Sequence, residues 1–431
     1  MVSPPLAGRD GWRGSFIFFR LACVVALGFG LAGPSPAQQV RRSWGLQEAL
    51  TAAMREHPAI LGSQSSQAAA RAEREGALWQ RYPSLTVEAS GPDSGGSSTV
   101  LRLDQPLWTW GRITAGIDAA GHREGAAGWA VRETRRDIAQ RVINAWTEAQ
   151  RHQLRRTHAL EGVRAHEDLL ALMSRRVAQE VSPKVDEDFA RSRLLLALND
   201  KAAVEQGLNA ALSQLSQLVG MQVSRAGGSL EDADAPANLD AALELAISRS
   251  PTLKRLEDEM LAAGEDVRSR RAAWLPQVSF RVERHMGTRP GGVLDDNRAL
   301  VVISAQPGAG LSSLSGVDAA VARQLATRRA REVAHRDLAQ QVNAEWEDLV
   351  SARARLRNTE QAGKMASQVF ESYMRQFTAG RKTWIDVLNA TREVTQTAFG
   401  IADAKAQSAA AAQRLRILAG YVDLETVDLA H

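Results

Sequence analysis

Cysteine is almost absent from this sequence. Its 431 residues contain one cysteine, Cys23, which lies close to the N-terminus. Three arginines precede an apolar run at residues 21–32, and small residues at 35–37 follow it, which is the pattern of a secretory signal peptide cleaved after Ala37. With residues 1–37 removed, the exported chain contains no cysteine, so disulfide bonds are excluded as its framework.

Long apolar runs and excess charge are also missing. Beyond residue 37, no run is long enough for a transmembrane helix. An exported chain without a spanning helix is either soluble or inserted in a membrane as a β-barrel. The formal net charge of +4 falls to +2 without the three arginines and one aspartate of residues 1–37. This balance gives no indication of nucleic acid binding.

Catalytic patterns are not recognisable either. The eight histidines are scattered without metal-ligand spacing, and no glycine-rich phosphate loop follows a strand. His158 and His166 share a helical face but lie two turns apart, so we interpret them as solvated side chains rather than ligands. The sequence predicts neither an enzyme nor a cofactor.

Proline is missing from two long stretches, residues 107–182 and residues 308–431. Both have helical character, and about 70 helical residues would extend for about 100 Å, far more than a small globular core needs. Their apolar stripes are narrow, as in the series Ile138, Val142 and Trp146. Such stripes bury little area per helix, so these rods are expected to pack laterally as in a coiled coil.

The sequence repeats itself. Leu46 and Pro58 recur as Leu239 and Pro251, each 193 positions later. Further along, the spacing becomes 200, and it relates Trp146 to Trp346, Asp186 to Asp386 and Leu215 to Leu415. We therefore expect a first structural repeat at residues 38–223, a linker at 224–238, a second repeat at 239–422 and a tail at 423–431.

Each repeat has the same expected order of elements: helix, strand, loop, strand, long helix, turn and helix. The first helices are expected at residues 46–80, with Ser43 as the N-cap, and at residues 239–273. Alternating residues predict strands at 84–90, 99–105, 278–283 and 300–305, and the loop of the second pair is expected at 285–297.

The predicted strands have one polar and one apolar face. Glu88, Arg102, Asp104, Arg281 and Glu283 would face water, and Leu85, Val87, Leu101, Leu103, Phe280 and Val282 would face lipid. Five aromatic residues fall at the helix–strand junctions and fit an interfacial aromatic girdle: Trp79, Tyr82, Trp108, Trp110 and Trp274. Four strands cannot enclose a lumen, so several copies would have to share one barrel. An ordinary soluble sheet would also explain the alternation.

Three segments together resemble the TolC family of outer-membrane efflux and secretion proteins. They are residues 104–108 followed by Gly111 and Arg112, Gly380 followed by residues 386–390, and residues 415–420. The resemblance covers nearly the whole exported chain. It rests on the order and spacing of these segments, since none of them is specific alone.

The resemblance implies a mainly helical fold with a transmembrane β component. Three identical chains, each with four strands, would form a 12-stranded barrel in the outer membrane of a Gram-negative bacterium, continuous with a periplasmic tube of 12 helices. Such a homotrimer is the passive exit duct of a tripartite export system for type I secretion or multidrug efflux. Its partners would be a periplasmic adaptor and an inner-membrane ABC exporter or proton-driven pump, besides outer-membrane lipid.

Within the family, the short loops and compact length resemble the subgroup that serves type I secretion. A soluble periplasmic coiled-coil adaptor or scaffold remains the alternative, because it would explain the helical stripes equally well.

The resemblance also assigns residues to the two helical turns. Adaptor contacts are expected at Val181, Ser182, Gly380 and Arg381, in the turns at residues 180–184 and 379–383. A gate or constriction at the periplasmic tip is expected from Asp386, Asn389, Asp186 and Lys382. For the acidic residues, a solvated charge that favours a helix start is the simpler alternative. Because Glu180 stands where the second turn has Gly380, the two turns are expected to differ in shape.

Overall fold

The computed structural model describes residues 43–91, 98–228, 230, 236–289, 292–306 and 308–421. The predicted signal peptide at 1–37, the tail at 423–431 and part of the linker at 224–238 lie outside the described residues.

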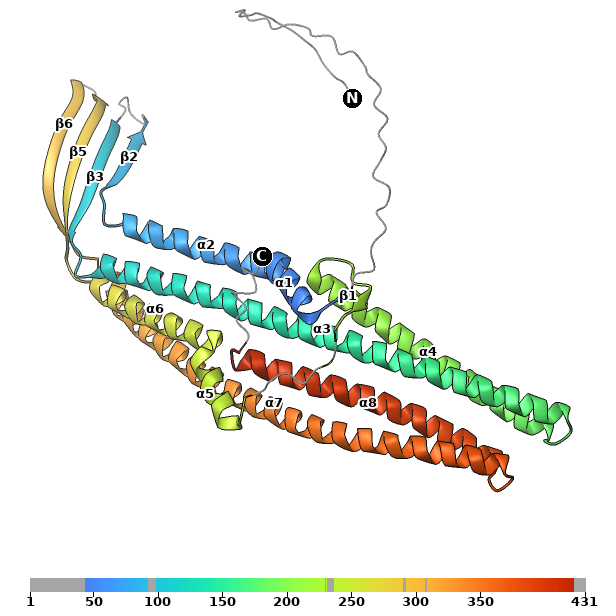
Figure 1. The fold of residues 1–431 in the computed structure, drawn as a ribbon. Coiled ribbons are helices and arrows are strands. Elements are labelled where there is room, and N and C mark those ends of the chain that lie inside the picture. Colours follow the sequence, from blue (N-terminus) through green and yellow to red (C-terminus); the bar gives the residue numbers. More distant parts are fainter. Residues whose placement is uncertain are drawn as a thin grey trace, which may run out of the picture. The chain divides into compact units, whose positions relative to one another are not determined.

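The described chain is mainly helical, and the predicted order of elements occurs twice (Figure 1). The first half contains β1 (Ser43–Trp44), α1 (Leu46–Glu56), α2 (Pro58–Trp79), β2 (Ser84–Ser90), β3 (Ser98–Trp108), α3 (Arg112–Ala178), α4 (Lys184–Val219) and β4 (Arg225–Ala226). The second contains α5 (Leu239–Arg249), α6 (Pro251–Ala273), β5 (Gln277–Arg289), β6 (Gly292–Ser304), the short 3₁₀ helix η1 (Ala309–Leu311), α7 (Ser312–Thr378) and α8 (Trp384–Leu418).

The first helix of each half is interrupted, which corrects the single helices expected at 46–80 and 239–273. The residue before a proline disfavours the helical region, and both His57 (ψ 125°) and Ser250 (ψ 116°) are extended. Each then caps the helix that follows. The Nδ1 atom of His57 accepts a hydrogen bond from the backbone N–H of Ala59, and the Ser250 hydroxyl accepts one from Leu253.

The start of α1 also differs from expectation, because its N-cap is Gly45 rather than Ser43. Ser43 instead pairs in parallel with Arg225, joining β1 to β4. Residues 225–228, which belong to the expected linker, are fixed against α3, since the amide of Gln150 donates hydrogen bonds to the carbonyl groups of Ala226, Gly227 and Gly228.

The other strands form one antiparallel sheet in the order β2-β3-β5-β6, and the β3–β5 pairing joins the two halves of the chain. The first predicted strand, 84–90, is confirmed, but the fourth begins at Gly292 instead of residue 300. Much of the expected loop at 285–297 is therefore paired, with Arg284 opposite Asn297 and His285 opposite Asp296. This part of the strand is rich in polar residues, so a hydrophobic pattern does not reveal it. In the structure, its backbone pairs with the adjacent strand β5.

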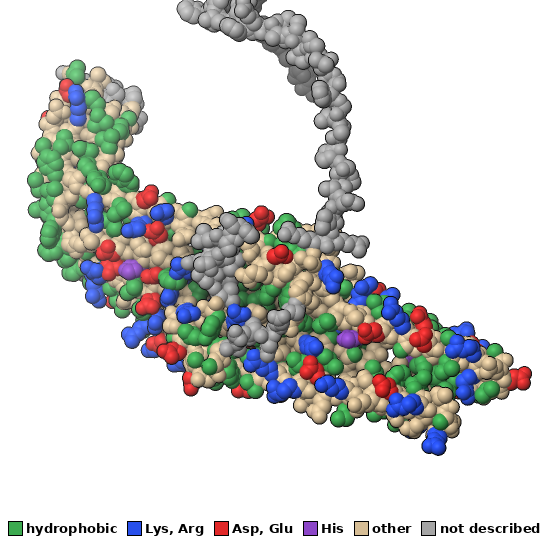
Figure 2. All heavy atoms as spheres, in the orientation of Figure 1, with side chains coloured by type: hydrophobic (Ala, Val, Ile, Leu, Met, Phe, Trp, Pro, Cys, Tyr) green, Lys and Arg blue, Asp and Glu red, His purple; other side chains and the backbone are tan. Residues whose placement is uncertain are grey.

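Strand pairing confirms the expected division of the sheet into two faces. Leu103 pairs with Leu85 and Val282, and the three side chains are exposed on the apolar face. Val301 and Ile303 extend this face onto β6, and hydrophobic side chains gather over the strands in Figure 2. An exposed apolar face of this extent marks a surface that contacts lipid or another protein.

The helices pack laterally around the two longest ones. Helix α3 contacts α2, α4, α6 and α8, and α7 contacts α5, α6 and α8. One hydrophobic core contains Val142 and Leu215, and a second contains Val342 and Leu415 at the equivalent positions. The duplication seen in the sequence is thus also a duplication of packing. Within the described residues, none of the helices combines the length and apolar character needed to cross a bilayer.

Candidate functional site

The turns that join α3 to α4 and α7 to α8 have the same backbone geometry. In the first, the N–H of Glu180 donates to the carbonyl of Val177 and that of Val181 to Arg176. In the second, Gly380 donates to Phe377 and Arg381 to Gln376. Both are the hydrogen-bond pattern that ends a helix with a left-handed residue.

The expectation that the two turns differ in shape is therefore wrong. Glu180 adopts φ of 59° although it is not a glycine, and Gly380 adopts φ of 71°. The helix-ending hydrogen bonds impose this conformation on whichever residue occupies the position. A left-handed conformation costs a residue with a Cβ about 1–2 kcal/mol, so Glu180 is held there by its surroundings.

Asp386 sits in the first turn of α8 in a reciprocal cap with Thr383. The Thr383 N–H donates to Oδ2 of Asp386 over 3.2 Å, and the Thr383 hydroxyl accepts from the Asp386 N–H. The hydroxyl also lies 2.8 Å from Oδ2 of Asp386. The hydrogen bond from the Thr383 side chain, then that from its backbone and the nearby Lys382 charge, lower the pKa of Asp386.

Lys382 lies close to Asp386. Its Nζ atom lies 3.8 Å from Oδ2 of Asp386 and 4.3 Å from the centre of the Tyr373 ring. The ring face attracts the ammonium group. The structure thus places two of the four expected gate residues in contact.

The remaining predicted tip residues are spread over both turns. Asn389 is exposed one helical turn after Asp386, and Asp186 is half-buried in the first turn of α4. Val181 and Arg381 are exposed, and the Ser182 hydroxyl accepts a hydrogen bond from Nε of Arg176 at 3.2 Å. Their roles in gating and adaptor contact stay predictions.

Glu187, next to Asp186, carries a polar network that the sequence argument missed. The buried carboxylate accepts hydrogen bonds from the Lys184 ammonium at 2.7 Å, the Ser174 hydroxyl at 3.1 Å and the Arg191 guanidinium at 3.2 Å. The bond from Lys184 is the main reason why the pKa of Glu187 is lowered. The sequence could have predicted this network, because Lys184 lies three residues before Glu187 and Arg191 lies four residues after it.

A hydrophobic core joins the two tips. It contains Leu169 and Met173 of α3, Ala190 of α4, Phe377 of α7, and Trp384, Val387 and Leu388 of α8. The rings of Phe377 and Trp384 have centroids 5.3 Å apart, and the Arg176 guanidinium lies over Phe377 at 5.1 Å. The two turns therefore share one packed unit, and separating them would expose large aromatic surfaces.

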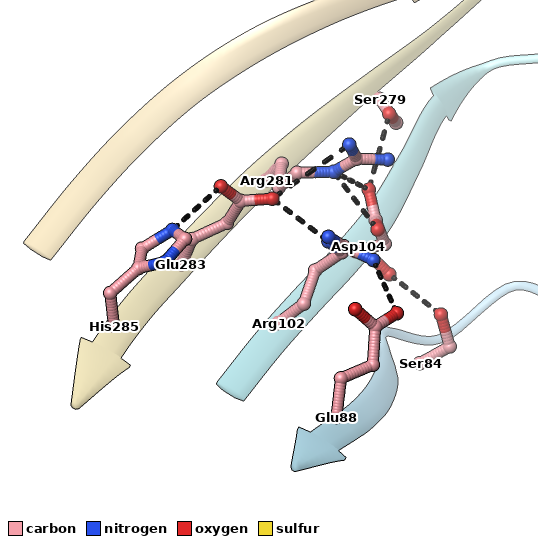
Figure 3. A network of polar contacts seen from close by, with 8 residues as sticks. All are labelled: Ser84, Glu88, Arg102, Asp104, Ser279, Arg281, Glu283 and His285. Carbon is pink, nitrogen blue, oxygen red and sulfur yellow. Dashed lines mark hydrogen bonds and ion pairs between the residues drawn. The ribbon is translucent and has the colours of Figure 1, made fainter. Parts of the chain in front are cut away.

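The polar face of the sheet forms a second candidate site, shown in Figure 3. Arg102 lies between two carboxylates, with Nε 2.8 Å from Glu283 and Nη1 3.0 Å from Glu88. Arg281 pairs with Asp104 at 2.9 Å. The five charged residues expected to face water are thus connected across β2, β3 and β5.

The five residues of the expected aromatic girdle are all exposed and lie where helix meets strand. Trp79 and Tyr82 have ring centroids 5.2 Å apart, and Trp108 and Trp110 have centroids 5.8 Å apart. The indole N–H of Trp110 donates to the carbonyl of Pro276 at 2.6 Å. Trp274 caps the end of α6. Contact with a membrane interface stays a prediction for them.

Metal binding has no support in the described part of the chain, where no group of three or more histidine, cysteine and acidic residues is placed to hold an ion.

Comparison with known proteins places this geometry in a family. The model of the family described as "Outer membrane efflux protein" matches residues 49–221 and 242–421, one segment in each half. The alkaline protease secretion protein AprF of Pseudomonas aeruginosa is 24% identical over 356 residues, which cover 77% of this chain and 71% of AprF.

Solved structures show the same fold. A membrane protein from Pseudomonas aeruginosa superimposes with a TM-score of 0.78 at 19% identity, covering 87% of this chain and 90% of that one. The outer membrane protein VceC from Vibrio cholerae gives 0.76 at 17% identity, covering 87% and 96%. The family and the fold are those of channel proteins. The chain belongs to the outer membrane efflux protein family and is an outer-membrane exit channel of the kind that serves tripartite efflux and secretion systems.

Proposed function

We propose that three copies of this chain assemble into one duct, which crosses the outer membrane and receives its cargo from a periplasmic adaptor and an inner-membrane exporter. The observation that carries the proposal is the two-faced sheet, apolar on one side and ion-paired on the other. A water-filled pore needs its polar face inside and its apolar face toward lipid.

The edges of the sheet support assembly from several copies. In the described chain, β2 and β6 are the outer strands, each with a single neighbour. Four strands do not close around a lumen, and open edges invite pairing with another chain. Two further copies would supply partners for both edges and give the 12 strands that the resemblance to the TolC family implies.

The helices support the same assembly. Along α7, apolar side chains are exposed at Val321, Leu325, Val333 and Val350. On α4, Leu195 and Leu198 are also exposed. These helices lie at the two edges of the helical layer in which α3 and α8 are central, so each fits the opposite edge of a neighbouring copy.

At the tips, Asp386, Asn389, Asp186 and Lys382 would form the constriction. A ring of carboxylates repeated by threefold symmetry in a narrow pore favours cations. Val181, Ser182, Gly380 and Arg381 would contact the adaptor, because they lie in the two turns, beyond the packed core that joins the hairpins. The matching geometry of the two turns would present similar surfaces to the adaptor.

Protein secretion is the preferred cargo class, because the relative AprF is described as an alkaline protease secretion protein. An ABC exporter would then be the inner-membrane partner. The alternative within the same duct is multidrug efflux with a proton-driven pump. A soluble periplasmic scaffold is not favoured by the family match.

Purified protein in detergent should have the mass of three chains and should form conducting pores in planar lipid bilayers. A soluble, monomeric periplasmic protein without conductance would refute the proposal. For the cargo, the chain should restore protease secretion to Pseudomonas aeruginosa lacking AprF. Restoration of drug resistance in a strain lacking an efflux duct, without restored secretion, would refute the type I assignment.

A further inference from the structure

A cavity lies between α3, α4 and α8, away from the tips and from the sheet. Its volume is about 210 Å³, and it is lined by Gly162 and His166 of α3, Arg193 of α4, and Arg392, Gln396 and Phe399 of α8, among others. A Cβ atom at Gly162 would lie 2.9 Å from the Thr395 hydroxyl oxygen, so the glycine lets α3 and α8 approach closely beside the cavity.

His166 is buried in the wall of this cavity, which corrects its interpretation as a solvated side chain. It is 6% exposed, and its buried Nδ1 atom has no hydrogen-bond partner. The buried Nε atom of Arg193 also lacks a partner. Unsatisfied polar atoms of this kind are rare in folded proteins, and an absent ligand is one explanation for them.

The charges at the cavity favour an anion. Arg193 and Arg392 face one carboxylate, that of Asp200. Within the described residues, neither arginine forms an ion pair. The Arg193 guanidinium lies 4.8 Å from the centre of the Phe189 ring, and its planar fork of N–H donors suits a carboxylate.

The cavity also has an apolar side, formed by Ala159, Leu196 and Phe399. A bare inorganic anion would leave these side chains facing water. An organic acid would place its charged end at the arginines and its hydrocarbon end against them.

We propose that this cavity binds a small organic carboxylate, with Arg193 and Arg392 holding the carboxylate, His166 donating a hydrogen bond and Leu196 and Phe399 covering the hydrocarbon. The bound molecule would connect the α3–α4 hairpin to α8. The lining residues of the site all come from one chain, and the site does not depend on the identity of the cargo.

Protonation of His166 would assist binding. Burial, and then the Arg193 charge, lower the pKa of His166, so the ring is neutral at pH 7 in the empty cavity. The groups that face it are Arg193 and Asp200 on α4 and Arg392 on α8. A carboxylate would offset both arginines and favour the protonated ring, so affinity should be higher at pH 6 than at pH 8.

The test uses the purified full-length channel in detergent. Crystals soaked in 4-bromobenzoate should show anomalous bromine density in this cavity, and calorimetric titration should detect benzoate binding that is tighter at pH 6 than at pH 8. Arg392→Gln should weaken it by about 10-fold or more, because a charged hydrogen-bonding partner is lost. Arg323→Gln, which changes an exposed arginine of α7, should bind as the wild type does.

Arg392→Lys keeps the charge without the planar fork and should bind with intermediate affinity, which provides a second comparison if Arg392→Gln does not fold. His166→Gln should abolish the difference between pH 6 and pH 8. Bromine density confined to other places, unchanged affinity in both Arg392 variants, or inorganic phosphate binding as tightly as benzoate would overturn the proposal.

Discussion

Glu180 and Gly380 adopt the same left-handed backbone conformation at equivalent positions of the two hairpin tips. Only glycine takes this conformation without steric cost. We expect Glu180→Gly to stabilise the protein by about 0.5–1 kcal/mol, since relief of the strain exceeds the entropy that glycine adds to the unfolded chain. Gly380→Ala should destabilise it by about 1 kcal/mol. Chemical denaturation measures both, and a destabilising Glu180→Gly would contradict the argument.

Asp386 is expected to contribute to block by divalent cations. In single-channel recordings, Asp386→Asn should weaken block by Mg²⁺ added from the periplasmic side, and Asn389→Asp should strengthen it, because a carboxylate ring at a constriction attracts cations. Asp188→Asn, an exposed acid of α4, is the matched control. Unchanged block in Asp386→Asn would remove this residue from the constriction.

The Glu187 network predicts a pH-dependent stability. The pKa of its carboxyl group is lower in the folded chain than the ordinary 4.5, mainly through Lys184. Its stabilising effect is therefore complete above pH 4.5 and is lost as pH falls through the lower folded value. Glu187→Gln should have a lower Tm than the wild type at pH 7, and this difference in Tm should disappear near pH 3. An equal Tm difference at both pH values would show that the charge is not responsible.

Arg102 separates Glu88 from Glu283 on the polar face of the sheet. Arg102→Gln removes the cation that lies between these carboxylates and leaves Glu283 with the weaker contact to Arg281 at 3.9 Å. We expect lower thermal stability and a shift of the reversal potential toward cation selectivity. Arg284→Gln removes an arginine that pairs with Asp295 on the other face of the sheet and serves as the control. A reversal potential equal to that of the wild type would place this network outside the conducting path.

Trp384 packs where both hairpins meet. Trp384→Ala should cost about 3–5 kcal/mol, because it removes a large buried side chain from a packed core. Loss of this shared core should also raise the open probability in bilayers. Trp384→Phe retains most of the contact with Phe377, so its stability and open probability should be close to those of the wild type. A Trp384→Ala channel with wild-type gating would show that the hairpins do not separate here during opening.

Much of the fold could be predicted from local sequence signals. The absence of proline marked the long helices, whose turns fall where Pro183 and Gly380 interrupt the pattern. Alternation predicted β2 at its observed ends, because one face is apolar throughout. The fourth strand was placed too late, since polar residues carry no such alternation. The helix breaks at Pro58 and Pro251 had a signal, the proline itself, that the single-helix expectation did not use.

The candidate sites could be predicted from the sequence only in part. The cap of Asp386 by Thr383 is local, and its spacing of three residues is visible in the sequence. The cavity around His166 is not, because its walls come from three helices whose relative rotation depends on packing.

The sequence by itself determined the duplication, the two-faced strands and the helical stripes, since each follows from the order and periodicity of side chains along one segment. Tertiary structure decided which buried groups meet. It gave Glu180 a glycine-like conformation, surrounded Glu187 with three donors and left His166 without a partner, because contacts between helices depend on how whole surfaces pack.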